Sequence, residues 1–137
     1  MKTPLTATLC AVAFLAFGCA THKPSDTSAL QGTWTAPAAG AGDASPSLLI
    51  HGSSFEFRES DPHQWFKGTF TLREDVDPKQ FVSVITNCAN PGFVGLTAFA
   101  IYRLDDRALL MTGNAPGNPS VPAAFGAPDS LTIEFKK

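Results

Sequence analysis

The chain has few cysteines, no excess of basic residues and no apolar run of membrane-spanning length, and each scarcity removes a class of protein. Ten Lys and Arg residues stand against twelve Asp and Glu residues, which gives a formal net charge of −2. No basic cluster is present, so neither nucleic-acid binding nor electrostatic docking to a membrane surface is expected. No window shows a helical apolar stripe of normal length, which disfavours helical folds.

Residues 1–18 have the pattern of an export signal. Lys2 provides a positive start, and residues 5–17 form an apolar segment of signal-peptide length that is too short to span a bilayer. The segment ends in Ala-Phe-Gly before Cys19 and resembles a bacterial lipobox, in which the cysteine receives acyl chains such as palmitate and becomes the new N-terminus. Because Ala16 stands where a lipobox usually has leucine, secretion after cleavage at Ala20 is the alternative.

This pattern predicts three parts: a signal peptide (1–18), a polar tether (19–29) and one folded domain (30–137). Acylation of Cys19 would anchor the domain in the cell envelope. Ala20, in place of an aspartate, fits sorting to an outer membrane, with the domain facing the periplasm; without acylation the protein would be periplasmic or secreted. Cys88 would then be the single thiol, so stability must come from packing and not from an internal disulfide.

A period of two dominates the predicted domain. In residues 66–73, FKGTFTLR, apolar residues or glycine alternate with polar residues, which is typical of a half-buried strand. We expect further strands at residues 30–35, 47–51, 55–58, 81–86, 96–104, 108–112 and 131–136. Short polar turns separate most of them, so the expected fold is all-β: one antiparallel up-and-down barrel of about eight strands, whose closure removes exposed edges.

Two segments resist a strand interpretation. Residues 36–46 form a loop of small residues, and residues 113–128 contain four prolines and three glycines. Long loops in small domains are often functional. The 113–128 loop is therefore either an interaction loop or a stiff strap over the barrel with Phe125 beneath it.

Four segments occur in order that together resemble a known family: LQGTW (30–34), KGTFTL with DPK (67–79), IYRLDDRALLM (101–111) and APGNPSVPAAF (115–125). The series resembles a small, largely uncharacterised lipocalin-like domain family first catalogued in planctomycete genomes. The resemblance implies a lipocalin-like barrel in which Gly32 allows close backbone packing and Trp34 plugs one end. The family hairpin has a glycine that residues 105–107 lack, and the arginine of its Arg-Pro pair is absent before Pro122.

The polar residues do not form a recognisable catalytic or metal-binding pattern. His51 and His63 lie at predicted turns, and Asp61 could orient His63, but no framed nucleophile accompanies them. The acidic run at residues 74–77 lacks the spacing of a calcium loop and is interpreted as a charged turn. We therefore expect no enzyme activity, no catalytic or metal-ligating residues and no cofactor.

Eleven phenylalanines and two tryptophans are generous for a domain of this size. Inward side chains of a small barrel either fill the interior or line a cavity for one ligand. The candidate liners are Phe55, Phe57, Phe70, Phe99 and Tyr102, with Ile101 as the alternative to Tyr102. The leading hypothesis is a lipid-anchored envelope protein that binds a small hydrophobic ligand. The alternative is a protein-interaction module, such as an inhibitor of an envelope hydrolase acting through residues 113–128.

Overall fold

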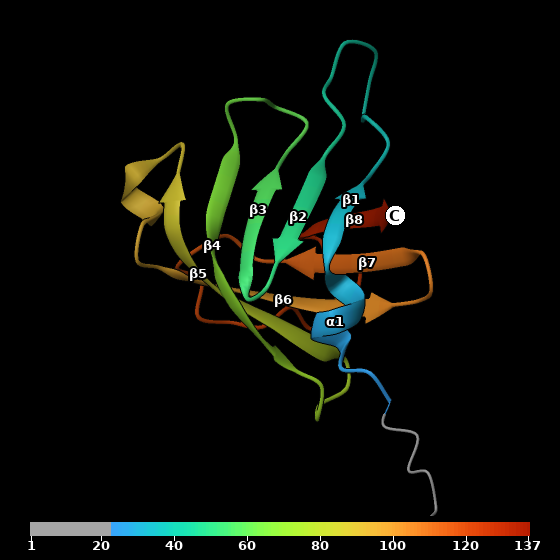
Figure 1. Cartoon of the computed structure of the whole chain (residues 1–137). Helices are drawn as coiled ribbons and strands as arrows, with labels where there is room; N and C mark the ends of the chain where they lie inside the picture. Colours follow the sequence, from blue (N-terminus) through green and yellow to red (C-terminus); the bar gives the residue numbers. More distant parts are fainter. Residues whose placement is uncertain (1–22) are drawn as a thin grey trace, which may run out of the picture.

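Alternation of apolar and polar side chains produces eight strands in the part of the chain that the computed structural model describes, residues 23–137 (Figure 1). The export signal and Cys19 lie outside these residues. The elements are α1 (Asp26–Leu30), β1 (Gly32–Thr35), β2 (Ser47–His51), β3 (Ser54–Arg58), β4 (Trp65–Arg73), β5 (Lys79–Cys88), the short 3-10 helix η1 (Pro91–Phe93), β6 (Thr97–Leu104), β7 (Ala108–Gly113) and β8 (Leu131–Lys136).

Each strand pairs antiparallel with the next along the chain, and β8 returns to β1 to close the barrel. The closing contact is narrow, because β1 and β8 pair only at Thr35 and Lys136. The predicted all-β, up-and-down, lipocalin-like barrel is confirmed. Within residues 23–137, no helix is long and apolar enough to cross a membrane.

The two ends of the barrel differ in their coverings (Figure 1). At one end, which we name the α1 end, lie α1 and the turns β2–β3, β4–β5 and β6–β7. At the opposite end, which we name the loop end, lie the segments 36–46, 59–64, 89–96 and 114–130. The helix α1 blocks one end, whereas loops and the single-turn η1 surround the other.

The α1 end is closed by Trp34, which is fully buried. Its indole N–H donates a hydrogen bond of 2.8 Å to the carbonyl of Leu30, at the end of α1. The Lys137 ammonium lies 4.9 Å from the centre of the indole ring and donates to the Ala29 carbonyl. Gly32 adopts φ +107°, a conformation that side chains disfavour, so glycine is required where the chain leaves α1.

A buried carboxylate attaches α1 to the barrel. Asp26 Oδ2 accepts hydrogen bonds from the Lys79 ammonium at 2.6 Å and from the Tyr102 hydroxyl at 2.8 Å. The Asp26 amide donates to the Glu74 carboxylate at 3.1 Å. The tether expected over residues 19–29 therefore ends before residue 26, because residues 26–29 belong to α1 of the folded domain. A helix of five residues is too short to show a helical repeat of apolar side chains, so the sequence did not predict it.

The loop 113–128 is a strap over the outer face of β6, β7 and β8. The Gly126 amide lies within hydrogen-bond distance of the hydroxyls of Thr112 and Thr132, and Phe125 lies beneath the Arg103 guanidinium at 5.4 Å. Thr112 is paired with Ile101, and both are buried although they face outward from the barrel. Ile101 is therefore covered on the outer face, while its neighbour Tyr102 points inward.

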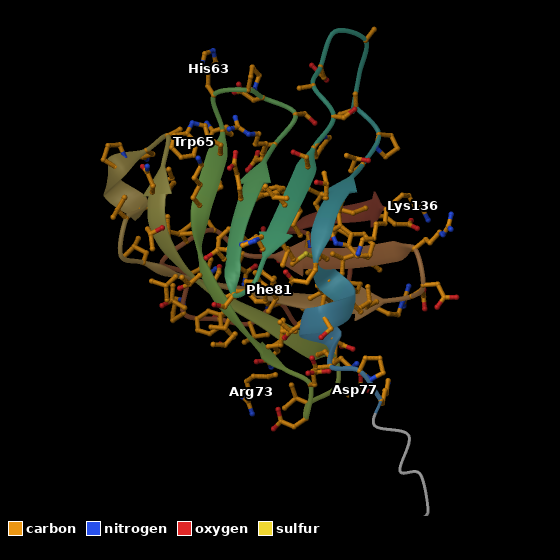
Figure 2. The ribbon with its side chains drawn as sticks, viewed as in Figure 1. His63, Trp65, Arg73, Asp77, Phe81 and Lys136 are labelled. Carbon is orange, nitrogen blue, oxygen red and sulfur yellow. The ribbon has the colours of Figure 1, made fainter. Side chains whose placement is uncertain are left out.

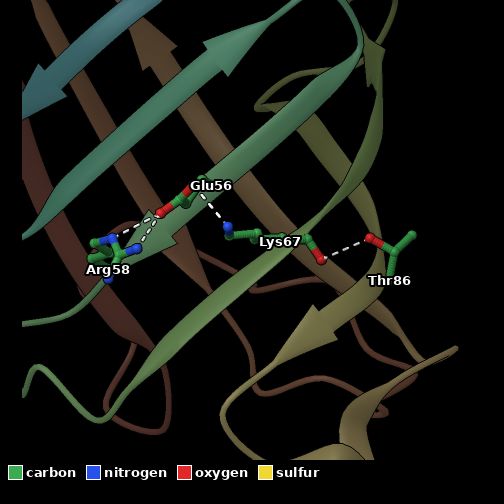
Figure 3. Close-up of polar contacts among 4 residues, drawn as sticks. All are labelled: Glu56, Arg58, Lys67 and Thr86. Carbon is green, nitrogen blue, oxygen red and sulfur yellow. Dashed lines mark hydrogen bonds and ion pairs between the residues drawn. The ribbon is translucent and has the colours of Figure 1, made fainter.

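The longest strands, β4 and β5, meet at a β-bulge beside Gly68. A side-chain carbon at Gly68 would lie 2.0 Å from the Val84 carbonyl oxygen and 3.0 Å from the Phe55 ring. Thr86, the extra residue of the bulge, donates its hydroxyl hydrogen to the Lys67 carbonyl (Figure 3). The bulge lets β5 bend across β4, which a side chain at this position would prevent.

We expect Gly68→Ala to lower the free energy of unfolding by about 3 kcal/mol, because the new methyl group collides with backbone that cannot move without breaking the ladder. Gly113→Ala is the matched control, since its methyl group would lie 3.5 Å from the Ala100 side chain, and it should change stability by less than about 1 kcal/mol. Denaturant unfolding measures both. Equal stability of the two variants would contradict this account of the bulge.

The Asp26 contacts predict an acid-sensitive contribution to stability. Burial raises the pKa of Asp26, but the hydrogen bonds from Lys79 and Tyr102 and the Lys79 charge outweigh it, so the pKa lies below its ordinary value of 3.8. A carboxyl whose pKa is lowered by folding stabilises the fold above the unfolded value, and this contribution disappears as the pH falls through the folded value.

Asp26→Asn should therefore cost about 2 kcal/mol at neutral pH, and the difference from the wild-type protein should shrink as the pH falls below 3.8. Asp106→Asn, in the exposed β6–β7 turn, is the control and should change little. Urea unfolding over a pH series gives the difference directly. A difference that stays constant down to the most acidic pH would show that the charge on Asp26 does not stabilise the fold.

Candidate ligand-binding cavity

The loop-end half of the barrel contains a cavity of about 450 Å³. Its apolar lining comes from β2, β3, β4, β5, β7, β8 and η1: Leu48, Phe55, Phe57, Phe66, Phe81, Ile85, Phe93, Met111, Leu131, Ile133 and Phe135. The small residues Ala98, Ala100 and Gly113 form the wall on β6 and at the end of β7. Because these residues have little or no side chain, the interior beside them stays empty where larger side chains would fill it.

Aromatic packing separates the cavity from the core at the α1 end. Phe81 stacks on Phe70 with ring centres 4.5 Å apart, and Phe55 packs edge-on against Phe81 at 5.9 Å. Phe55 and Phe81 line the cavity, whereas Phe70 lies beneath them and does not. We name these three rings the floor of the cavity.

A second group of rings forms the side of the cavity nearest the loops. Phe57 and Phe66 are cross-strand partners with nearly parallel rings 6.4 Å apart. Phe135 packs edge-on against Phe57 at 6.3 Å, and Phe93 of η1 reaches to 6.1 Å from Phe66. These mutual contacts hold the rings in place and leave apolar faces toward the empty volume.

Three of the five expected liners belong to the cavity and two lie elsewhere. Phe55 and Phe57 line it through strand β3. Phe99 is also in the wall, but strand alternation turns its side chain away from the face that Ala98 and Ala100 present. Phe70 is the lower ring of the floor and does not line the cavity.

Tyr102 is outside the cavity because its hydroxyl is bound to Asp26 at the α1 end. Periodicity identified the inward face of β3 and β4, but not that of β6, where Phe99 and Tyr102 cannot both point inward, and it did not give the height of a residue along the barrel.

Polar groups gather where the cavity meets the loop end, and we name Glu59, Gln64, Asn114 and Asp129 the rim. Glu59 follows Phe57 by two residues and Gln64 precedes Phe66 by two, so both share the inward face of those rings. The Glu59 amide donates to the Gln64 carbonyl at 3.0 Å, which extends the ladder by one pair. This spacing is visible in the sequence and could have identified both residues.

The two sides of the rim differ in their hydrogen bonding. The Asn114 side chain donates to the Ser120 carbonyl at 2.8 Å and accepts from the Ser130 hydroxyl at 2.6 Å, so it holds the strap. Within residues 23–137, the Glu59 carboxylate has no hydrogen-bond or ion-pair partner, although it is half-buried. Burial and then the charge of Asp61 raise the pKa of Glu59 above its ordinary value.

A second hollow adjoins the cavity at the seam between β1 and β8. It is lined by residues of the 36–46 loop and of β8, and it shares Glu59, Leu131 and Ile133 with the main cavity. The hollow exists because β1 is shorter than β8 and pairs with it only at Thr35. Glu59 therefore lies where the interior of the barrel meets the outside.

The remaining polar residues singled out in the sequence do not form a site. His51 and His63 are exposed, and Figure 2 shows His63 on the β3–β4 loop pointing away from the barrel. Asp61 accepts a hydrogen bond from the backbone amide of His63 at 2.9 Å, which makes a turn and leaves the imidazole unoriented. Among residues 23–137, no three His, Cys, Asp or Glu side chains are grouped as metal ligands would be.

The charged turn at residues 74–77 is also accounted for by structure. Glu74 accepts the Asp26 amide, and Asp75 lies 3.5 Å from the Arg73 guanidinium (Figure 2 shows Arg73 and Asp77 at the α1 end). Cys88 is buried, and its thiol donates to the Asn90 carbonyl at 2.8 Å.

No protein-family model, curated protein or solved structure matches this chain. The resemblance to the planctomycete lipocalin-like family therefore stays a prediction. The closed eight-strand barrel and its half-empty interior stand on the geometry described above.

Proposed function

We propose that this protein binds a small hydrophobic molecule in the loop-end half of its barrel and acts as a lipid-anchored protein of the bacterial envelope. The observation that carries the proposal is the apolar cavity of about 450 Å³, which opens at one end and is closed at the other by the aromatic floor. Ligand pockets for small molecules have volumes of about 300–1,000 Å³ and combine an apolar lining with a few polar groups. The Phe-rich lining and the four-residue rim have this composition.

The chemistry of the lining supports binding without catalysis. Ser83 is the one hydroxyl side chain in the described lining, and it donates to the Ala98 carbonyl at 3.3 Å. No histidine lies among the lining residues of the described chain, so Ser83 has no base beside it. We therefore propose a carrier or binding role and no enzyme activity.

The position of the cavity is compatible with an anchor at Cys19. The described chain enters the barrel at α1, and the rim lies at the opposite end (Figure 1). The seven residues from Cys19 to Asp26 would span about 25 Å at full extension. A barrel held this way would keep its α1 end toward the membrane and its cavity mouth toward the aqueous side, open to ligand exchange with other envelope components.

A large side chain placed inside the cavity should weaken binding of a hydrophobic ligand. We expect the wild-type protein to bind the neutral, apolar dye N-phenyl-1-naphthylamine saturably, with the fluorescence gain of an apolar site. In Ala98→Trp the indole would occupy the space beside Ser83 and weaken binding at least about tenfold. Ala124→Trp, on the exposed strap, is the matched control and should retain affinity. Equal affinity of wild type and a folded Ala98→Trp protein would place the dye elsewhere.

The anchor is tested separately by fractionation. Cys19→Ser removes the acylated thiol and should move the protein from the membrane fraction to the soluble fraction, because acyl-chain burial is the main force that holds a lipoprotein at a bilayer. Cys88→Ser, which changes a buried thiol inside the barrel, should leave the protein in the membrane fraction. Unchanged membrane partitioning of the Cys19→Ser protein would remove lipid anchoring from the proposal and leave ligand binding standing.

A further inference from the structure

Two carboxylates and no cationic side chain occur among the described residues that line the cavity. Glu59 and Asp129 lie at the rim, whereas Lys, Arg and His are missing from the lining within residues 23–137. A ligand with an anionic head would bring a second negative charge to this rim. A ligand with a cationic head would find two opposite charges there.

Glu59 is positioned to contact a bound molecule. Strand alternation places Phe55, Phe57 and Glu59 on one face of a continuous segment, and all three line the cavity, with Glu59 beyond Phe57 toward the loop end. Gln64, immediately before β4, is joined to Glu59 by a backbone hydrogen bond and lines the cavity beyond Phe66. An apolar chain lying in the cavity against Phe57 and Phe66 would therefore end beside Glu59.

The Glu59 carboxylate lacks a partner of its own. It is half-buried, and no donor within the described residues 23–137 forms a hydrogen bond or ion pair with it. Its raised pKa has burial as the main cause, and the neighbouring charge of Asp61 adds to it. A donor on a ligand would supply the contact that the protein does not.

The charged groups around Glu59 do not reverse this preference. In the adjoining hollow, Lys136 is 2.6 Å from Glu134, and Asp61 adds another negative charge. Arg58 precedes Glu59 but faces the outer surface, where it pairs with Glu56, as does Lys67 at 3.4 Å (Figure 3). The nearby cations are thus already bound to carboxylates outside the cavity.

The aromatic rings favour the same class of head group. Phe57, Phe66 and Phe93 lie next to the rim, and aromatic faces attract cations, most strongly where water is excluded. The same rings give an anion no favourable contact with their negative faces.

We propose that the cavity selects a cationic amphiphile: an apolar chain lies in the cavity against the Phe57 and Phe66 rings, and a protonated amine contacts the Glu59 carboxylate at the rim. This assignment rests on the proposed ligand-binding function and specifies the head group of its ligand. Fatty-acid anions are the class that it excludes.

The test compares three molecules with the same alkyl chain: decylamine, decanol and decanoate. Each is titrated into the purified full-length protein by calorimetry at neutral pH, below the micelle concentration of the amine and the carboxylate and below the solubility limit of decanol. We expect decylamine to bind most tightly, decanol less tightly and decanoate most weakly, with about tenfold or more between the amine and the carboxylate.

Glu59→Gln keeps the size of the side chain and removes its charge, so it should reduce decylamine affinity about tenfold and leave decanol affinity nearly unchanged. Glu56→Gln, on the same strand but facing outward, is the matched control and should not alter the order. Asp129→Asn gives a second, smaller reduction at the exposed side of the rim.

The possible outcomes distinguish failure of the head-group assignment from failure of the proposed ligand-binding function. Decanoate binding as tightly as decylamine, or an amine preference that survives Glu59→Gln, would overturn the head-group assignment while ligand binding stands. An amine preference lost equally in Glu56→Gln would show a general surface-charge effect and overturn it as well. Absence of binding by all three molecules would overturn both the assignment and the proposed function.

Discussion

The stacking of Phe81 on Phe70, with Phe55 against its edge, divides the interior of this barrel into two parts with different tasks. Below the floor, toward α1, the interior is filled by Trp34 and by the hydrogen-bonded group around Asp26. Above it, the interior is partly empty. A barrel of this strand number can be filled or can hold one small ligand, and the aromatic floor allows this barrel to do both at different heights.

The filled half provides the stability on which the empty half depends. An unfilled cavity forfeits the dispersion contacts that a packed core would gain, so the fold needs compensation elsewhere. Here the compensation lies at the α1 end, where the Trp34 ring is completely buried and its N–H is satisfied by α1. The Asp26 carboxylate joins α1 to β5 and β6 in the same region, so the helix is part of the domain's closure.

The narrow pairing between β1 and β8 affects both the closure of the barrel and the access to its cavity. A single paired position between β1 and β8 closes the barrel and so removes the exposed edges of the sheet. The same short pairing leaves a hollow beside Glu59. Among residues 23–137 the Glu59 carboxylate has no donor, and a half-buried charge without a donor is poorly solvated and therefore unfavourable. In the proposed complex the amine of the ligand would supply the donor that this carboxylate needs.

The sequence by itself determined the strands and their faces, because a period of two is local: eight expected strands, most of their bounds and the inward position of Phe55 and Phe57 follow from residue order. Only the tertiary structure decided the height of each ring along the barrel. It placed Phe70 beneath Phe81 in the floor, bound Tyr102 to Asp26 and included residues 26–29 in the fold. It also placed Glu59 at the mouth without a partner among the described residues 23–137. These outcomes depend on strand stagger, on closure and on contacts between residues far apart in the chain, none of which alternation along one strand can encode.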